Sequence, residues 1–221
     1  MLVLDLERPE RFYYILIRPN RRSWMAWGAY FLTAHGAIAA TWVFAGWLGA
    51  DTLLARLVWP AAVASLLATC YTGPLFAQAR GRDLWQGALA TVDLLAQALV
   101  EGAATLLLAE TAFARRPRAT DLGLVLAAAL VAHLVIVSWE HLLAPSRTRH
   151  RELATAVIRR GALAPAFWGG AIGCCLLSLG ASALAGWTTG PAVVAAAGFA
   201  LAGSLAWEYV WIEAGQAVPL S

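Results

Sequence analysis

The chain has 221 residues, of which 61% are hydrophobic and 13% are charged, and its mean hydropathy is +0.66. Soluble globular domains carry about 25% charged residues, so this composition excludes a water-soluble globular protein. The formal net charge is +3, and every basic residue is Arg.

The apolar residues gather in blocks that are long enough to cross a hydrocarbon core of roughly 30 Å as helices. In chain order we expect six spans, at residues 24–48, 53–78, 84–109, 122–144, 163–187 and 190–213. The predicted fold is an all-α integral membrane protein, a six-helix transmembrane bundle forming one domain over residues 1–221. Residues 1–23 precede the first span as an extramembrane segment, and residues 147–160 are expected to form a short interfacial helix.

The Arg residues are distributed unequally between the two faces of the predicted bundle. Six spans place both termini on one face, and that face receives twelve of the sixteen Arg residues. The positive-inside rule then places the termini on the cytoplasmic side of a bacterial inner membrane. The alternative is that the Arg excess docks an acidic partner.

One predicted span carries a stripe of polar residues. Gln86, Asp93, Gln97 and Glu101 follow one another at separations of 7, 4 and 4 residues, which places them on a single helix face. An ionised carboxylate that faces lipid costs roughly 2.5–3.5 kcal/mol near the bilayer centre. We therefore expect this stripe to face the interior of the bundle.

Two His residues lie near the middle of other spans, His35 in the first and His133 in the fourth. Together with Asp93, Gln97 and Glu101 they predict a proton pathway, since imidazole and carboxylate groups move protons through apolar protein. Two alternatives remain: interhelical hydrogen bonds that only fix the packing, and a bis-His haem. Glu140 and His141 are expected to lie in solvent at a span end, and Glu208 and Glu213 likewise.

The second span ends in Tyr71, Thr72, Gly73 and Pro74. Pro kinks a helix and opens a groove beside the Tyr, and a quinone needs an apolar cleft with one or two hydrogen-bond donors. Tyr71 and Gly73 are thus candidates for a quinone site. The three Cys residues have no CxxC spacing, so neither a cluster nor a metal site is expected on this chain.

Several segments carry a resemblance to a known family. They are Asp5 to Phe12, Arg18 to Tyr30, Tyr71-Thr72-Gly73 followed by Arg82, Leu84 and Trp85, and the closing Ala214-Gly215-Gln216. In these segments the chain resembles the NrfD-like membrane subunits, the polysulfide reductase membrane-anchor family. The six predicted spans would correspond to the last six of an eight-span fold, so the first two spans would be missing or supplied by other membrane subunits.

The resemblance implies a membrane anchor of a multisubunit oxidoreductase, which exchanges electrons between the quinone pool and an iron–sulfur partner subunit. A molybdopterin-type catalytic subunit would complete the complex. Menaquinone or ubiquinone would be an exchangeable substrate, and the chain would bind no haem, no iron–sulfur cluster and no nucleic acid. The family's quinone site carries over to Tyr71, and the expected docking residues are Arg8, Arg11, Arg21 and Arg22.

Two rival interpretations come from other functional classes. A secondary transporter would also need intramembrane carboxylates and a broken helix, but it predicts paired internal repeats, and none can be defended in this sequence. A purely structural anchor would lack a working quinone site, and its Tyr71 would be dispensable.

Overall fold

The computed structural model describes residues 14–113, 119–146, 148–185 and 190–218, and over these ranges its regular elements are all helices. The all-α class is therefore confirmed. Within the described residues, five helical stretches are long and apolar enough to cross a membrane: Asp51–Ala77, Ala90–Phe113, Asp121–Leu143, Ala166–Leu184 and Pro191–Ala217. They match five of the six predicted spans. The predicted span at 24–48 corresponds to the 24-residue helix α2 (Trp24–Trp47). Because its Trp, Tyr and His side chains lower its mean hydropathy, α2 is not among the five stretches, and a sixth span stays a prediction.

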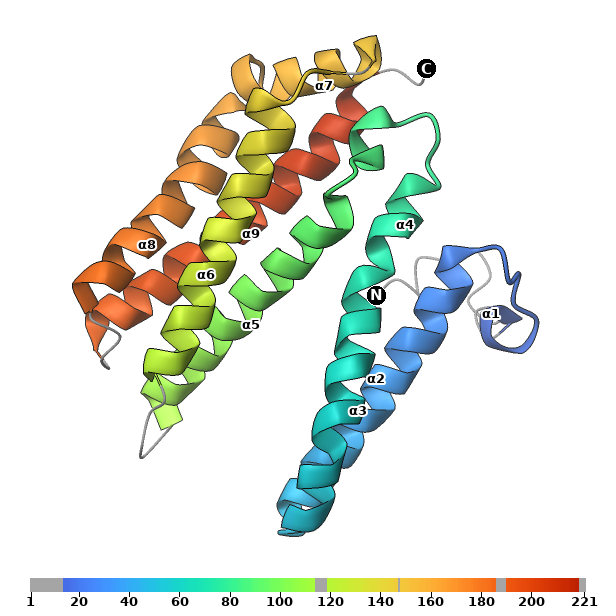
Figure 1. Cartoon of the computed structure of the whole chain (residues 1–221), viewed down its shortest axis with the longest axis vertical. Coiled ribbons are helices and arrows are strands. Elements are labelled where there is room, and N and C mark those ends of the chain that lie inside the picture. The colour runs from blue at the N-terminus through green and yellow to red at the C-terminus, as the bar shows by residue number, and fades with distance from the viewer. Residues whose placement is uncertain (1–13, 114–118, 147, 186–189, 219–221) are drawn as a thin grey trace. The chain divides into compact units, whose positions relative to one another are not determined.

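The chain divides into two compact units, Met1–Gln78 and Ala79–Ser221, and each is described by itself. The prediction of one domain stays a prediction. The first unit contains α1 (Tyr14–Ile17), α2, α3 (Asp51–Cys70) and α4 (Thr72–Ala77). Figure 1 shows α2 and α3 running side by side as a hairpin. The turn between them uses Gly49 at a φ of 65°, a conformation that glycine adopts without steric cost.

A glycine on α2 sets the position of Tyr71 within the first unit. A Cβ on Gly28 would overlap the Tyr71 ring, so the absence of a side chain there lets the ring lie directly on the α2 backbone. Phe31, one helical turn further along, meets the same ring edge-on with centroids 6.5 Å apart. Tyr71 is thus held between the end of α3 and one face of α2.

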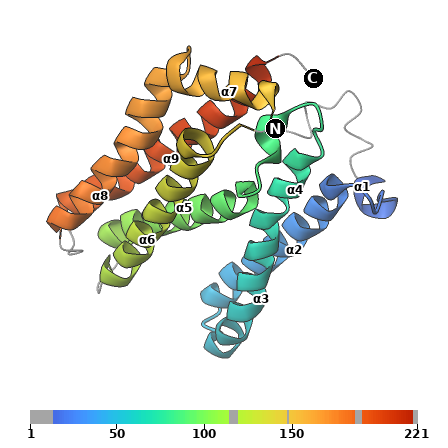
Figure 2. The ribbon, with the colours of Figure 1, turned by 45° about the horizontal axis from the view of Figure 1, so that its top comes forward.

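The second unit begins with the short 3-10 turn η2 (Asp83–Gln86) and continues through four long helical rods. The rods are α5 (Ala90–Phe113), α6 (Ala119–Ser138) with the π-helical turn η3 (Trp139–Leu143), the π-helical segment η4 (Ala166–Gly173) with α8 (Cys174–Ala185), and α9 (Pro191–Ala217). Figure 1 and Figure 2 show α5 beside α6 and α8 beside α9, and α9 also packs on α5. Their common core is apolar, with Val100, Leu107, Leu126, Leu130 and Ala200 at most 1% exposed.

Small residues bring α9 close to the rod formed by η4 and α8. A Cβ on Gly170 would lie 2.7 Å from the Ala206 Cβ, and a Cβ on Gly203 would lie 2.8 Å from the Cys175 sulfur. Contacts this short are available only to glycine. Close approach through small residues is how helices associate where lipid removes the hydrophobic driving force.

Helix α7 (Arg149–Arg160) lies across the end of the four rods at which α9 ends (Figure 2). It confirms the short helix expected at 147–160. Thr148 caps it by accepting a hydrogen bond from the Arg151 backbone N–H at 3.2 Å, the usual role of a Thr in that place. Its buried face carries His150, Ala154 and Ile158, whereas Leu153 is exposed.

The start of α5 differs from the predicted span. Because Asp83–Gln86 form η2, the long helix begins at Ala90, and the Gln86 side chain instead donates to the Arg80 carbonyl oxygen at 2.8 Å. Gln86 therefore does not belong to the polar stripe, and this part of the prediction was wrong.

The segment around η2 is joined to the end of α9. The Arg82 guanidinium donates to the Gly215 carbonyl oxygen and lies 5.3 Å from the centre of the Trp85 ring. The Trp85 indole N–H donates to the Trp211 carbonyl oxygen at 3.2 Å. Two of the sequence segments that carry the family resemblance, far apart in the chain, thus meet in one junction.

This junction predicts a stability effect at Gly215. A Cβ on Gly215 would overlap the Trp85 indole, so Gly215→Ala should lower the free energy of unfolding by roughly 1–3 kcal/mol, the usual cost of overpacking. Gly198→Ala on the same helix is the matched control, because nothing lies within 4 Å of a Cβ there. The measurement is SDS-induced unfolding of the full chain in mixed micelles. Equal stability of the two variants would contradict the packing described.

Candidate functional site

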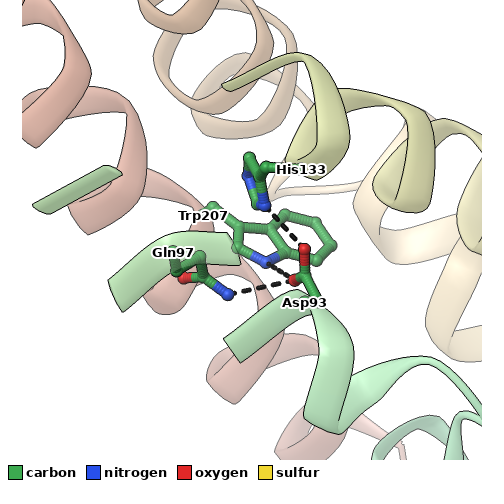
Figure 3. Close-up of polar contacts among 4 residues, drawn as sticks. All are labelled: Asp93, Gln97, His133 and Trp207. Carbon is green, nitrogen blue, oxygen red and sulfur yellow. Dashed lines mark hydrogen bonds and ion pairs between the residues drawn. The ribbon is translucent and has the colours of Figure 1, made fainter. Parts of the chain in front are cut away.

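A buried carboxylate, Asp93, is the centre of a hydrogen-bond network within the second unit (Figure 3). His133 Nδ1 of α6 lies 2.7 Å from Asp93 Oδ1. Gln97 Nε2, one turn further along α5, donates to Asp93 Oδ2 at 3.0 Å, and Trp207 Nε1 of α9 donates to the same oxygen at 3.0 Å. These four residues are at most 6% exposed. The network therefore joins three helices through one carboxylate.

The position of Asp93 on its helix also favours a negative charge. It lies in the first turn of α5, where unpaired backbone N–H groups give the helix end a partial positive charge. An ionised carboxylate buried without partners is unstable in an apolar interior. The helix end and the N–H donors of Gln97 and Trp207 together offset part of this cost, and the close His133 contact allows a proton to be shared between imidazole and carboxylate.

The π-helical turn η3 brings His141 to the same place. His141 follows His133 by eight residues, which at 3.6 residues per turn would rotate it about 80° away from the His133 face. A π-helical turn takes more residues per turn and reduces this rotation. As a result, the His133 and His141 rings both contact the Trp207 ring edge-on, with centroids 5.9 Å and 5.1 Å away.

The expectation that His141 lies in solvent was therefore wrong, since it is only 3% exposed. Its neighbour Glu140 is half-buried, and its Oε1 accepts a hydrogen bond from the Leu89 backbone N–H at 3.2 Å. Arg151 of α7 approaches the same carboxylate, with 3.8 Å between Nη2 and Oε1. Glu140 of η3 thus lies beside the N-terminal end of α5, and Asp93 lies in the first turn of that same helix.

Glu101, the last member of the predicted stripe, is half-buried on α5 two turns beyond Asp93. Glu208 of α9 and His133 are close enough to interact with it electrostatically. Asp93, Gln97, Glu101 and His133 therefore form one polar region. The spacing predicted the first three, and His133 was expected with them from its place near the middle of its span. Their role in proton transfer stays a prediction. Glu208 is exposed on α9, as is Glu213.

The other predicted site residues lie in the first unit or outside the described residues. His35 is half-buried on α2, with its Nδ1 3.3 Å from Ser65 Oγ. Tyr71 lies at the junction of α3 and α4, and Gly73 is buried in α4. Arg21 and Arg22 are exposed before α2, whereas Arg8 and Arg11 lie outside the described residues.

The sequence did not single out Trp207, which is 2% exposed and donates directly to Asp93. Nothing in the sequence distinguished it from other Trp residues that lie inside apolar blocks, such as Trp42 and Trp168. As to metals, the described residues contain no group of three or more His, Cys, Asp or Glu side chains arranged to hold an ion.

The network predicts that Trp207 stabilises the unit through its indole N–H. Trp207→Phe keeps most of the ring but removes the donor to Asp93, which should lower the free energy of unfolding by about 1.5–3 kcal/mol, the usual range for a hydrogen bond to a charged group. Trp168→Phe is the matched control, since that exposed indole donates only to the Arg159 carbonyl oxygen. SDS unfolding of both variants measures the difference, and no excess loss for Trp207→Phe would contradict the assignment.

Comparison with known proteins identifies the family. No curated protein and no solved structure matches the chain. The family model described as "Polysulphide reductase, NrfD" matches residues 1–219, which is nearly the whole sequence. Members of this family are membrane subunits of polysulfide reductase-like complexes and anchor other subunits. With its apolar helices and its match over residues 1–219, the chain belongs to the NrfD family.

Proposed function

We propose that this chain exchanges electrons between the quinone pool and an iron–sulfur partner subunit, and that Asp93 and His133 supply or remove the accompanying protons. The observation that carries the proposal is the 2.7 Å contact between these two side chains inside a bundle of membrane-spanning length. Ionisable groups in such a place are expensive to bury, and they usually mark a route for ions or protons.

Quinone chemistry requires a source of protons, which the Asp93–His133 pair would provide. Reduction to the quinol takes two electrons and two protons, so a quinone-reactive subunit needs a proton supply beside its electron donor. An imidazole hydrogen-bonded to a carboxylate holds a proton between two sites. Gln97 and Trp207 hold the carboxylate in place while the proton moves.

The quinone site is proposed at Tyr71 in the first unit, with Gly73 beside it. Phe31 contacts the Tyr71 ring and also lines an apolar groove between α2 and α3, which has a volume of about 480 Å³ and includes Pro60 and Leu67. An apolar cleft with a phenol donor nearby suits a flat ring that carries two carbonyl acceptors. In this proposal the quinone is an exchangeable substrate of the chain.

Partners and orientation complete the proposal. The exposed Arg21 and Arg22, with Arg8 and Arg11, would dock the iron–sulfur subunit, because Arg forms bidentate contacts with carboxylates. A molybdopterin-type subunit would receive or supply the electrons beyond it. The Arg distribution supports a bacterial inner membrane with the termini on the cytoplasmic side.

The proton role predicts that Asp93→Asn slows quinone turnover while the complex still assembles. Asn keeps the size and the acceptor oxygen of Asp93 but does not exchange protons near neutral pH, so turnover should fall by roughly 100-fold, the lower range for lost acid–base catalysis. The measurement is quinol turnover in the intact membrane complex, with subunit content checked on the same sample. Glu213→Gln, an exposed carboxylate on α9, is the control. Unchanged turnover in Asp93→Asn would remove the proton role.

The quinone role predicts a specific effect of Tyr71→Phe. Loss of the phenol O–H leaves the ring packed on Gly28 but removes one donor to the quinone, so KM for quinol should rise by roughly tenfold, as for the loss of one hydrogen bond. Tyr209→Phe, an exposed phenol on α9, should leave KM unchanged. An unaltered KM in Tyr71→Phe would favour the purely structural anchor.

A further inference from the structure

A small cavity lies beside Asp93 in the second unit. It has a volume of about 10 Å³, and its lining includes Asp93, Gln97, Glu140, His141 and Trp207. That volume is about what a single water molecule requires. The cavity is therefore too small for an organic ligand, and the polar side chains of Asp93, Gln97, Glu140 and His141 in its otherwise apolar lining distinguish it from an empty apolar void.

Two buried polar atoms of that lining have no hydrogen-bond partner, Gln97 Oε1 and His141 Nδ1. The residues that carry them are 4% and 3% exposed. A buried polar atom left unpaired costs about 1–3 kcal/mol, so such atoms are nearly always paired with protein or with ordered water. One water can donate to both atoms, and this arrangement gives it the two or more polar partners that a buried water needs.

Glu140 is shared between this small cavity and a wider cleft of the unit. It lines the cavity, and it also lines an open cleft of about 320 Å³ together with Asp83, Gln86 and Arg151. Its carboxylate rests on the backbone of Gly87, where a Cβ would lie 2.8 Å from Oε1 and 2.9 Å from Oε2. The missing Cβ of Gly87 therefore makes room for the carboxylate at the boundary of the two spaces.

We propose that one ordered water occupies this small cavity and that Glu140 passes protons between the open cleft and that water. Glu140 takes a proton from solvent in the cleft and gives it to the water. The water then turns toward Asp93, which lines the same cavity, and releases another of its protons to the Asp93–His133 pair. Glu140 then returns to the carboxylate form, and the pair has gained one proton. The transfer of the proton to the Asp93–His133 pair rests on the proposed function, whereas the water site does not depend on it.

The test measures deuterium exchange of the Trp207 indole N–H, which donates to Asp93 beside the cavity. The full chain is placed in nanodiscs, the exchange is followed by indole NMR, and Trp207→Phe identifies the signal. Glu140→Gln keeps the size of the side chain and an acceptor for the Leu89 N–H, but it cannot carry a proton. Exchange should slow by roughly tenfold or more in this variant.

Three further variants separate proton transfer from structure. Glu140→Asp retains a carboxylate and should restore much of the exchange. Gly87→Ala should slow it, because the new Cβ displaces the Glu140 carboxylate. Glu152→Gln removes an exposed carboxylate of α7 that lines neither space. In this variant the Trp207 indole N–H should exchange at the same rate as in the unaltered chain.

The outcomes distinguish this inference from the proposed function, because the exchange needs no quinone and no partner subunit. If Glu140→Gln exchanges at the unaltered rate, the role of Glu140 is overturned, whatever Asp93→Asn does to turnover. If Glu140→Gln slows exchange while Asp93→Asn leaves turnover unchanged, the water route holds and the proton role in quinone chemistry fails.

Discussion

The arrangement of the second unit depends on placing one carboxylate inside a bundle of apolar helices. In water Asp93 would be solvated at no cost, but in the bundle each oxygen needs a donor from the protein. The donors come from α5, α6 and α9, so the network fixes the position of each helix relative to the other two. A fully satisfied network of this kind specifies one packing arrangement, which nonspecific apolar contacts alone do not.

Glycines elsewhere in the second unit allow close contacts between side chains and the backbone. Gly87 lets the Glu140 carboxylate lie on the backbone, Gly215 lets the Trp85 indole lie on α9, and Gly203 lets α9 approach Cys175. The turn η3 acts in the same direction, because it rotates His141 back toward Trp207. Glycine and a π-helical turn each lower the stability of a helix, and they occur here where side chains come into close contact.

The sequence alone predicted the helices and part of the Asp93 network. The residues that it missed were missed for a physical reason. Helical periodicity shows which residues share a face, so Asp93 and Gln97 were found together. It does not show which helix packs on that face, so Trp207 was missed. It also assumes one regular helix, which is why Gln86 was assigned to the stripe and His141 to solvent, although a short turn precedes α5 and a π-helical turn ends α6. Tyr71 stays a predicted quinone residue that its Pro context suggested, and its packing on Gly28 could be seen only in the structure.

The Asp93–His133 pair suits a low-dielectric site for an electrostatic reason. With one proton shared between them, the pair is neutral as a whole, either as carboxylate and imidazolium or as acid and imidazole. A second proton gives it a net positive charge, and the loss of the first gives it a net negative charge, and both states are costly in an apolar interior. A pair that passes protons on must enter and leave such a charged state, so the proposed proton role requires a path from the pair to water. Glu140 is half-buried and lines both the small cavity beside Asp93 and the open cleft at this end of α5. In this proposal the burial of Asp93 therefore calls for a nearby ionisable group that reaches the cleft, and Glu140 is such a group.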